Sequence, residues 1–133
     1  MKRLSVLLLI AVLALAVTPA CKKSGGSTEA TLAVTITPAN GSTNLNLLGP
    51  DFPLKVEITS TMPPSGVKID ISAQKDGSSD PAFFTSTNNS TAGVTNYTIT
   101  NTPSSVTCVV TVTVTSISNS GNKWTGTYRY SKK

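Results

Sequence analysis

The stretch "VTCVVTVTVTS", Val106 to Ser116, carries the most regular pattern in the chain. Apolar and polar residues alternate along most of it, and it contains neither glycine nor proline. Alternation with a period of two places one set of side chains on each face of a β-strand, whereas a helix requires a period near 3.6. Valine and threonine also suit a pleated surface because both branch at Cβ. The stretch therefore predicts a long strand with one buried face.

Segments with the same period occur throughout the rest of the chain. They are "ATLAVTIT" (30–37), "FPLKVEITS" (52–60), "GVKIDISAQ" (66–74), "VTNYTIT" (94–100) and "KWTGTYRY" (123–130), with a weaker candidate in "AFFTST" (82–87). Turn sequences rich in Gly, Pro, Asn and Asp separate them, and "SISNSGNKW" predicts a hairpin between the last two strands. No segment has helical spacing. We expect an all-β protein, an antiparallel β-sandwich of about seven strands.

A family resemblance is carried by "ITPANGSTNLNLLGPDFPLKVEIT", residues 36–59. It resembles the opening of bacterial immunoglobulin-like domains, with a turn followed by a second strand, on Pro38, Asn40, Gly41, Ser42, Thr43, Leu54, Val56 and Ile58. The resemblance implies an Ig-like or fibronectin-like sandwich over residues 30–133. It also implies a structural, adhesive or binding role. The Cys…Trp…Cys pattern of antibody domains is absent, so this version would lack the disulfide.

The N-terminus has the pattern of a secretory leader. Lys2 and Arg3 precede a run from Leu4 to Val17 that is apolar apart from one serine. About fourteen residues are too few to span a bilayer, which takes roughly 20, but they suit the apolar core of a signal peptide. The run ends in "TPAC", at Cys21.

This ending resembles the lipobox of bacterial lipoproteins, and "CKK" resembles the start of mature lipoproteins from Bacteroidetes-like bacteria. The resemblance implies cleavage before Cys21 and a covalent lipid on its thiol. Residues 1–20 would then be the signal peptide, residues 21–29 a lipidated cysteine and flexible Gly/Ser tether, and residues 30–133 the domain. An ordinary signal peptide and an uncleaved anchor are the alternatives.

Composition and net charge limit the classes of molecule that the protein is expected to bind. Loss of the first twenty residues leaves 113 of 133, and loss of Lys2 and Arg3 lowers the formal net charge from +5 to +3. So small a surplus, without a basic cluster, argues against nucleic-acid binding. We expect a membrane partner through the lipid, at the bacterial outer membrane. Surface-exported lipoproteins of this type carry acidic residues after the cysteine, whereas the first acid here is Glu29. A periplasm-facing position is therefore favoured.

Residues for catalysis are scarce. The chain has no histidine, which excludes Ser-His-Asp and Cys-His nucleophiles and removes the commonest transition-metal ligand. Glu57 and Asp70 lie on the polar faces of strands that could be neighbours, although each also has a lysine two residues away. The acids of "KDGSSDP" predict an exposed turn more than a calcium loop. Cys108 predicts a buried lone thiol. We expect no enzyme activity, no cofactor apart from the lipid, and no metal.

One aromatic stripe, formed by Trp124, Tyr128 and Tyr130, is the candidate ligand site. Two interpretations stay open: the stripe is the inner face of the last strand, or it is a platform on which sugars stack. The favoured function is a structural or protein-interaction module. The alternatives are a glycan-binding adhesion module and a pilus-type subunit that assembles by strand exchange, with the strand at 106–115 as the accepting edge.

Overall fold

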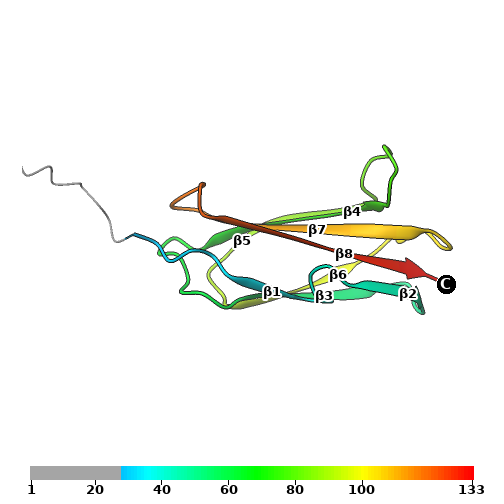
Figure 1. Ribbon diagram of the computed structural model, residues 1–133, viewed down its shortest axis with the longest axis horizontal. Helices are drawn as coiled ribbons and strands as arrows, with labels where there is room; N and C mark the ends of the chain where they lie inside the picture. The colour runs from blue at the N-terminus through cyan, green and yellow to red at the C-terminus, as the bar shows by residue number, and fades with distance from the viewer. Residues whose placement is uncertain (1–27) are drawn as a thin grey trace, which may run out of the picture.

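A computed structural model describes residues 28–133, which form a β-sandwich of eight strands (Figure 1). The predicted signal peptide, Cys21 and most of the predicted tether lie outside these residues. The strands are β1 (Val34–Thr37), β2 (Thr43–Leu47), β3 (Phe52–Ile58), β4 (Val67–Lys75), β5 (Phe84–Ser90), β6 (Val94–Ile99), β7 (Thr107–Ser116) and β8 (Lys123–Lys132). Nowhere in this part of the chain is there a helix long and apolar enough to cross a membrane.

The strands form two sheets, which lie face to face along the long axis of the molecule (Figure 1). The three-stranded sheet has the order β1-β3-β6, and the five-stranded sheet has the order β2-β8-β7-β4-β5. All pairs are antiparallel except β2 with β8, which is parallel. The predicted all-β sandwich is confirmed, but with a mixed sheet and one more strand than expected.

The extra strand is β2, which arises where the chain changes sheets. After β1 in the small sheet, the turn at Asn40 and Gly41 carries the chain across to the large sheet. There the next strand, β2, runs parallel to β8. Gly41 has a φ of +78°, a left-handed conformation that glycine adopts without strain. The Asn40 Oδ1 accepts a hydrogen bond from the Thr127 amide at 2.8 Å, which fastens this turn to β8. The parallel pairing follows from this crossing.

The core comes from the alternating faces that the sequence predicts. Buried and partly buried residues alternate along the whole of β7, and β3 and β4 bury every second side chain. The buried members include Leu54, Val56, Ile69, Ile71, Cys108, Val110, Val112 and Val114. Since all eight strands and this core lie within residues 28–133, this part of the chain has what it needs to fold by itself.

β7 is a central strand, not an edge. It pairs with β4 on one side and β8 on the other over nearly its full length. Both rows of its backbone hydrogen-bonding groups are therefore occupied, so the prediction that it accepts a donor strand is wrong. The alternation of buried and partly buried side chains along β7 is unbroken, because its inner side chains fill the core while its partner strands flank both edges.

The first described residues are fastened at the opposite end of the molecule from the C-terminus (Figure 1). Glu29, which the sequence places in the tether, accepts hydrogen bonds from the Ser118 hydroxyl and from Asn122 Nδ2. The Asn122 Oδ1 in turn accepts a hydrogen bond from the Leu32 amide at 2.9 Å. Packing on the β7–β8 hairpin thus begins at Glu29, inside the predicted tether.

Candidate functional site

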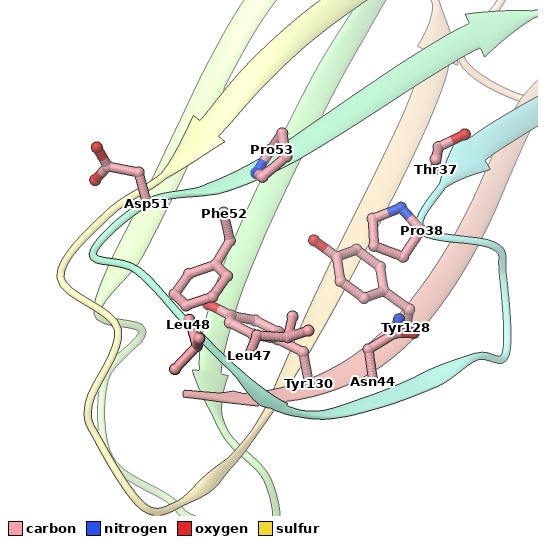
Figure 2. A pocket seen from close by; sticks show the side chains of 10 residues that line it. All are labelled: Thr37, Pro38, Asn44, Leu47, Leu48, Asp51, Phe52, Pro53, Tyr128 and Tyr130. Atoms are coloured by element: carbon pink, nitrogen blue, oxygen red, sulfur yellow. The ribbon is translucent and has the colours of Figure 1, made fainter. Parts of the chain in front are cut away.

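A pocket of about 470 Å³ opens between the two sheets near the C-terminal end of β8, and we call it the end pocket (Figure 2). Its polar members are Thr37, Asn44 and Asp51. The others are apolar or aromatic: Pro38, Leu47, Leu48, Phe52, Pro53, Tyr128 and Tyr130. Three separate chain segments build the pocket: the end of β1, the segment from β2 to the start of β3, and β8. It lies where the chain crosses from one sheet to the other.

Two of the three aromatic residues singled out in the sequence line this pocket from inside the sandwich. Tyr128 and Tyr130 are 2% and 0% exposed, so they are core residues and the inner-face interpretation holds for both. The ring of Tyr130 packs on Phe52 at 4.9 Å between ring centroids. Its hydroxyl lies 2.7 Å from the Thr102 Oγ1, a buried hydrogen bond. Burial is the main reason that the pKa of Tyr130 rises to about 12.

The hydroxyl of Tyr128 is buried without a hydrogen-bond partner among the described residues. Figure 2 shows its ring extending from β8 toward β3, with the hydroxyl directed at the side of the pocket formed by Phe52 and Pro53. Burial raises the pKa of this phenol, and the neighbouring Tyr130 raises it further. The hydroxyl therefore stays protonated at any physiological pH and is available as a donor.

Trp124 lies apart from the two tyrosines. It is partly buried and packs on the core near the start of β8, where its ring covers Gly126. A Cβ added at Gly126 would lie 2.7 Å from Trp124 Cζ2, so the ring occupies the space that a side chain would need. A sugar-stacking platform requires exposed ring faces, and in this stripe only Trp124 is more than 2% exposed. The three residues thus do not form one exposed surface.

The two carboxylates considered for catalysis are not brought together. Glu57 is on β3 in the small sheet and Asp70 is on β4 in the large sheet, and their polar faces point away from each other. Each pairs with the lysine on its own strand instead: Lys55 with Glu57 at 2.9 Å, and Lys68 with Asp70 at 3.1 Å. The predicted approach of the two acids is wrong, because consecutive strands here belong to different sheets.

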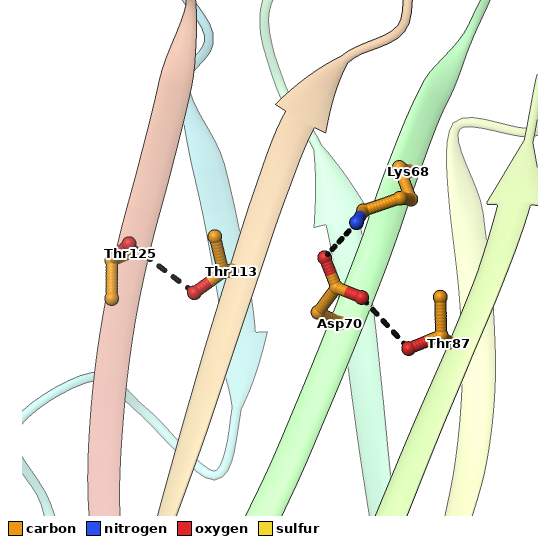
Figure 3. Close-up of polar contacts among 5 residues, drawn as sticks. All are labelled: Lys68, Asp70, Thr87, Thr113 and Thr125. Carbon is orange, nitrogen blue, oxygen red and sulfur yellow. Dashed lines mark hydrogen bonds and ion pairs between the residues drawn. The ribbon is translucent and has the colours of Figure 1, made fainter. Parts of the chain in front are cut away.

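Asp70 belongs to a polar network on the outer face of the large sheet (Figure 3). The Thr87 hydroxyl donates to Asp70 at 2.7 Å, and Thr113 and Thr125 lie 3.4 Å apart on neighbouring strands. Partial burial raises the pKa of Asp70, but the Thr87 hydroxyl and Lys68 outweigh it, so the net shift is downward. These are cross-strand pairs of the kind that stabilise a sheet face.

The remaining candidate side chains, two aspartates and one cysteine, are either paired with a basic residue or buried. Asp76 accepts a hydrogen bond from Arg129 Nε at 2.7 Å, and Asp80 pairs with Lys75 at 3.1 Å. Among residues 28–133 no group of three or more His, Cys, Asp or Glu side chains is placed to hold a metal. Cys108 is a fully buried free thiol whose pKa is raised, chiefly by burial.

Sequence reasoning missed most of the end pocket. Leu47, Leu48 and Asp51 lie in "NLNLLGPD", where polar and apolar residues alternate over only the first four positions, too few to predict a strand. The one signal is Leu48, a large apolar residue next to a Gly-Pro pair, and its side chain is 79% exposed. A comparison of the chain with protein-family models and with curated proteins yields no match.

Proposed function

We propose that this protein is a lipid-anchored lipoprotein of the bacterial cell envelope, whose β-sandwich is a non-catalytic interaction module. The observation that carries the proposal is the N-terminal pattern: a positive start, an apolar run of about fourteen residues, and Ala20-Cys21. Two or three acyl chains hold a protein firmly on a membrane, whereas one holds it weakly. The lysines at 22 and 23 add attraction to anionic headgroups.

The arrangement of the domain suits such an anchor. Glu29, docked on the β7–β8 hairpin, is eight residues from Cys21, a span of at most about 28 Å. The hairpin end would therefore stay close to the membrane. The end pocket is lined in part by β2 and the β2–β3 loop, and these segments lie at the far end of the long axis, beside the C-terminus (Figure 1). An anchored domain would present this end to the surrounding compartment, which we take to be the periplasm.

The strand order supports an Ig-like module. β1, β3 and β6 correspond to strands A, B and E, and β8, β7 and β4 to strands G, F and C. β5 then takes the place of C′, and β2 is the part of the first strand that crosses to the second sheet. Ig-like sandwiches serve widely as structural and binding modules, and this assignment rests on that architecture alone.

The test of the anchor is the intact mass of the protein extracted from bacterial membranes. We expect a chain that begins at Cys21 and carries the added mass of acyl groups. Cys21→Ala should abolish the acyl mass and the membrane association, whereas the matched variant Cys108→Ala should keep both. A mature chain without added mass, or one that retains residues 1–20, contradicts the proposal.

The interaction role is tested separately by crosslinking in intact cells. A photoreactive amino acid in place of Leu48 samples the end away from the anchor, and one in place of Ser120 samples the hairpin near the anchor. We expect partner adducts at position 48 and not at position 120. Equal labelling at both positions, or none at either, contradicts an interaction surface at the end away from the anchor.

A further inference from the structure

We propose that the end pocket binds a small uncharged molecule with an apolar body and one oxygen that accepts a hydrogen bond, such as the carbonyl of a ketone or ester. The inference goes beyond the proposed function, because it concerns the pocket alone and holds whether or not Cys21 carries a lipid. Three observations carry it: an unpartnered buried hydroxyl, an apolar enclosure of suitable size, and the charge of the lining.

The first observation is the hydroxyl of Tyr128. The chain has three tyrosines, and the other two have partners: Tyr130 bonds with Thr102, and Tyr97 donates to Asn88. Tyr128 is 2% exposed and its hydroxyl has no partner in the described part of the chain. A buried polar group without a partner is costly, and native proteins rarely keep one without a reason. Because this hydroxyl is enclosed, a ligand that parts the apolar side chains covering it would bring its oxygen into contact and supply the missing acceptor.

The second observation is the shape and lining of the cavity. Pro38, Phe52 and Pro53 form rigid apolar walls, with Leu47 and Leu48 beside them (Figure 2). Its volume of about 470 Å³ falls within the 300–1,000 Å³ common for small-molecule sites. Leu48 is 79% exposed, so an apolar molecule in contact with it would remove apolar surface from water.

The third observation is charge. Asp51 is the one ionisable acid in the lining, and neither lysine nor arginine lines the pocket. A carboxylate or phosphate would enter without a positive partner and would face Asp51, which is unfavourable for a desolvated anion. An uncharged ligand avoids this cost, and the protonated phenol of Tyr128 selects one that accepts a hydrogen bond.

The test uses residues 22–133, which include the whole described domain, and a matched pair of seven-carbon probes. The probes are 2-heptanone, which is neutral with an acceptor oxygen, and heptanoate, which is an anion of similar size. Binding is followed by backbone amide chemical shifts in a two-dimensional NMR titration. We expect saturable shifts for 2-heptanone at Leu47, Leu48 and Phe52. We expect heptanoate to bind at least tenfold more weakly.

The hydrogen bond is tested with Tyr128→Phe, which removes one oxygen, and with the matched variant Tyr97→Phe outside the pocket. Tyr128→Phe should weaken 2-heptanone binding by about tenfold, and Tyr97→Phe should leave it unchanged. Leu48→Asp, on the exposed loop, should weaken binding without disturbing the core. Absence of saturable shifts at the pocket, equal binding of both probes, or unchanged binding to Tyr128→Phe overturns the proposal. None of these results depends on the state of Cys21.

Discussion

Two tyrosines on β8 differ in the surroundings of a single oxygen. The hydroxyl of Tyr130 is bonded to Thr102, whereas that of Tyr128 has no partner. Removing an unsatisfied buried hydroxyl relieves its desolvation cost, so Tyr128→Phe should raise the free energy of unfolding by about 1 kcal/mol. Tyr130→Phe should lower it by about 1–2 kcal/mol, because Thr102 loses its partner. Urea unfolding of residues 22–133 measures both, and equal effects of the two variants would contradict this account.

Trp124 and Gly126 make a second residue-level contact that can be tested. An added Cβ at Gly126 meets Trp124 Cζ2 at 2.7 Å and Asn40 Oδ1 at 3.0 Å. Gly126→Ala should therefore displace the indole ring, lower the free energy of unfolding by about 1–3 kcal/mol, and shift tryptophan emission to the red. Gly93→Ala is the control, since nothing lies within 4 Å of its added Cβ. An unchanged emission spectrum in Gly126→Ala would contradict the predicted displacement.

At the scale of elements, the N-terminal segment is joined to the β7–β8 hairpin by Glu29. The Ser118 hydroxyl and then Asn122 lower the pKa of this carboxyl below 4.5 by donating to its charged form. Because the pKa is lower in the folded state, the contribution to stability is present above about pH 4.5. It is lost as the pH falls through the folded pKa.

The resulting prediction compares Glu29→Gln with the unaltered residues 22–133 at pH 7 and at pH 3. The variant should have the lower urea midpoint at pH 7, and the difference should shrink as the pH falls through the lowered pKa of Glu29 and the carboxyl takes up a proton. Ser118→Ala keeps the carboxyl but removes a donor, so an NMR titration should show the pKa of Glu29 moving up toward 4.5. A difference between the variant and the unaltered chain that is independent of pH would exclude this linkage.

The elements also show what sequence reasoning can reach. β4 and β7 are predictable because each alternates regularly and the alternation coincides with burial, with Val67, Ile69, Ile71 and Ala73 all inside on β4. β2 is not predictable, because its side chains are mostly exposed and its hydrogen bonds go to a strand more than eighty residues later. Regular alternation in a sequence indicates a strand with one buried face, and β2 has no buried face.

The end pocket could not be predicted either, because no local pattern in the sequence marks its lining. Its lining comes from three chain segments that meet only because the first strand divides between the sheets. The sequence identified Tyr128 and Tyr130 as members of an aromatic stripe but left their environment open. The sequence did not indicate that the Tyr130 hydroxyl would bond with Thr102 while the Tyr128 hydroxyl would have no partner. Both outcomes depend on segments that are distant in the sequence.

At the scale of the whole molecule, the number of free thiols reports the state of the N-terminus. The chain has two cysteines, and Cys108 is fully buried with a raised pKa. A thiol so enclosed reacts slowly until the sandwich unfolds. Protein extracted from bacterial membranes without reductant should therefore show no reactive thiol from Cys108 in the folded state.

Unfolding the same sample should expose one thiol per chain if Cys21 carries a lipid through its sulfur. Two thiols would mean that Cys21 is present and free, and none would mean that the two cysteines form a disulfide. Either result contradicts the anchor. Cys108→Ala provides the control, because the unfolded, lipidated variant should show no thiol at all. The thiol count of the folded sample thus tests the burial of Cys108, and the thiol count of the unfolded sample tests the lipid proposed on Cys21.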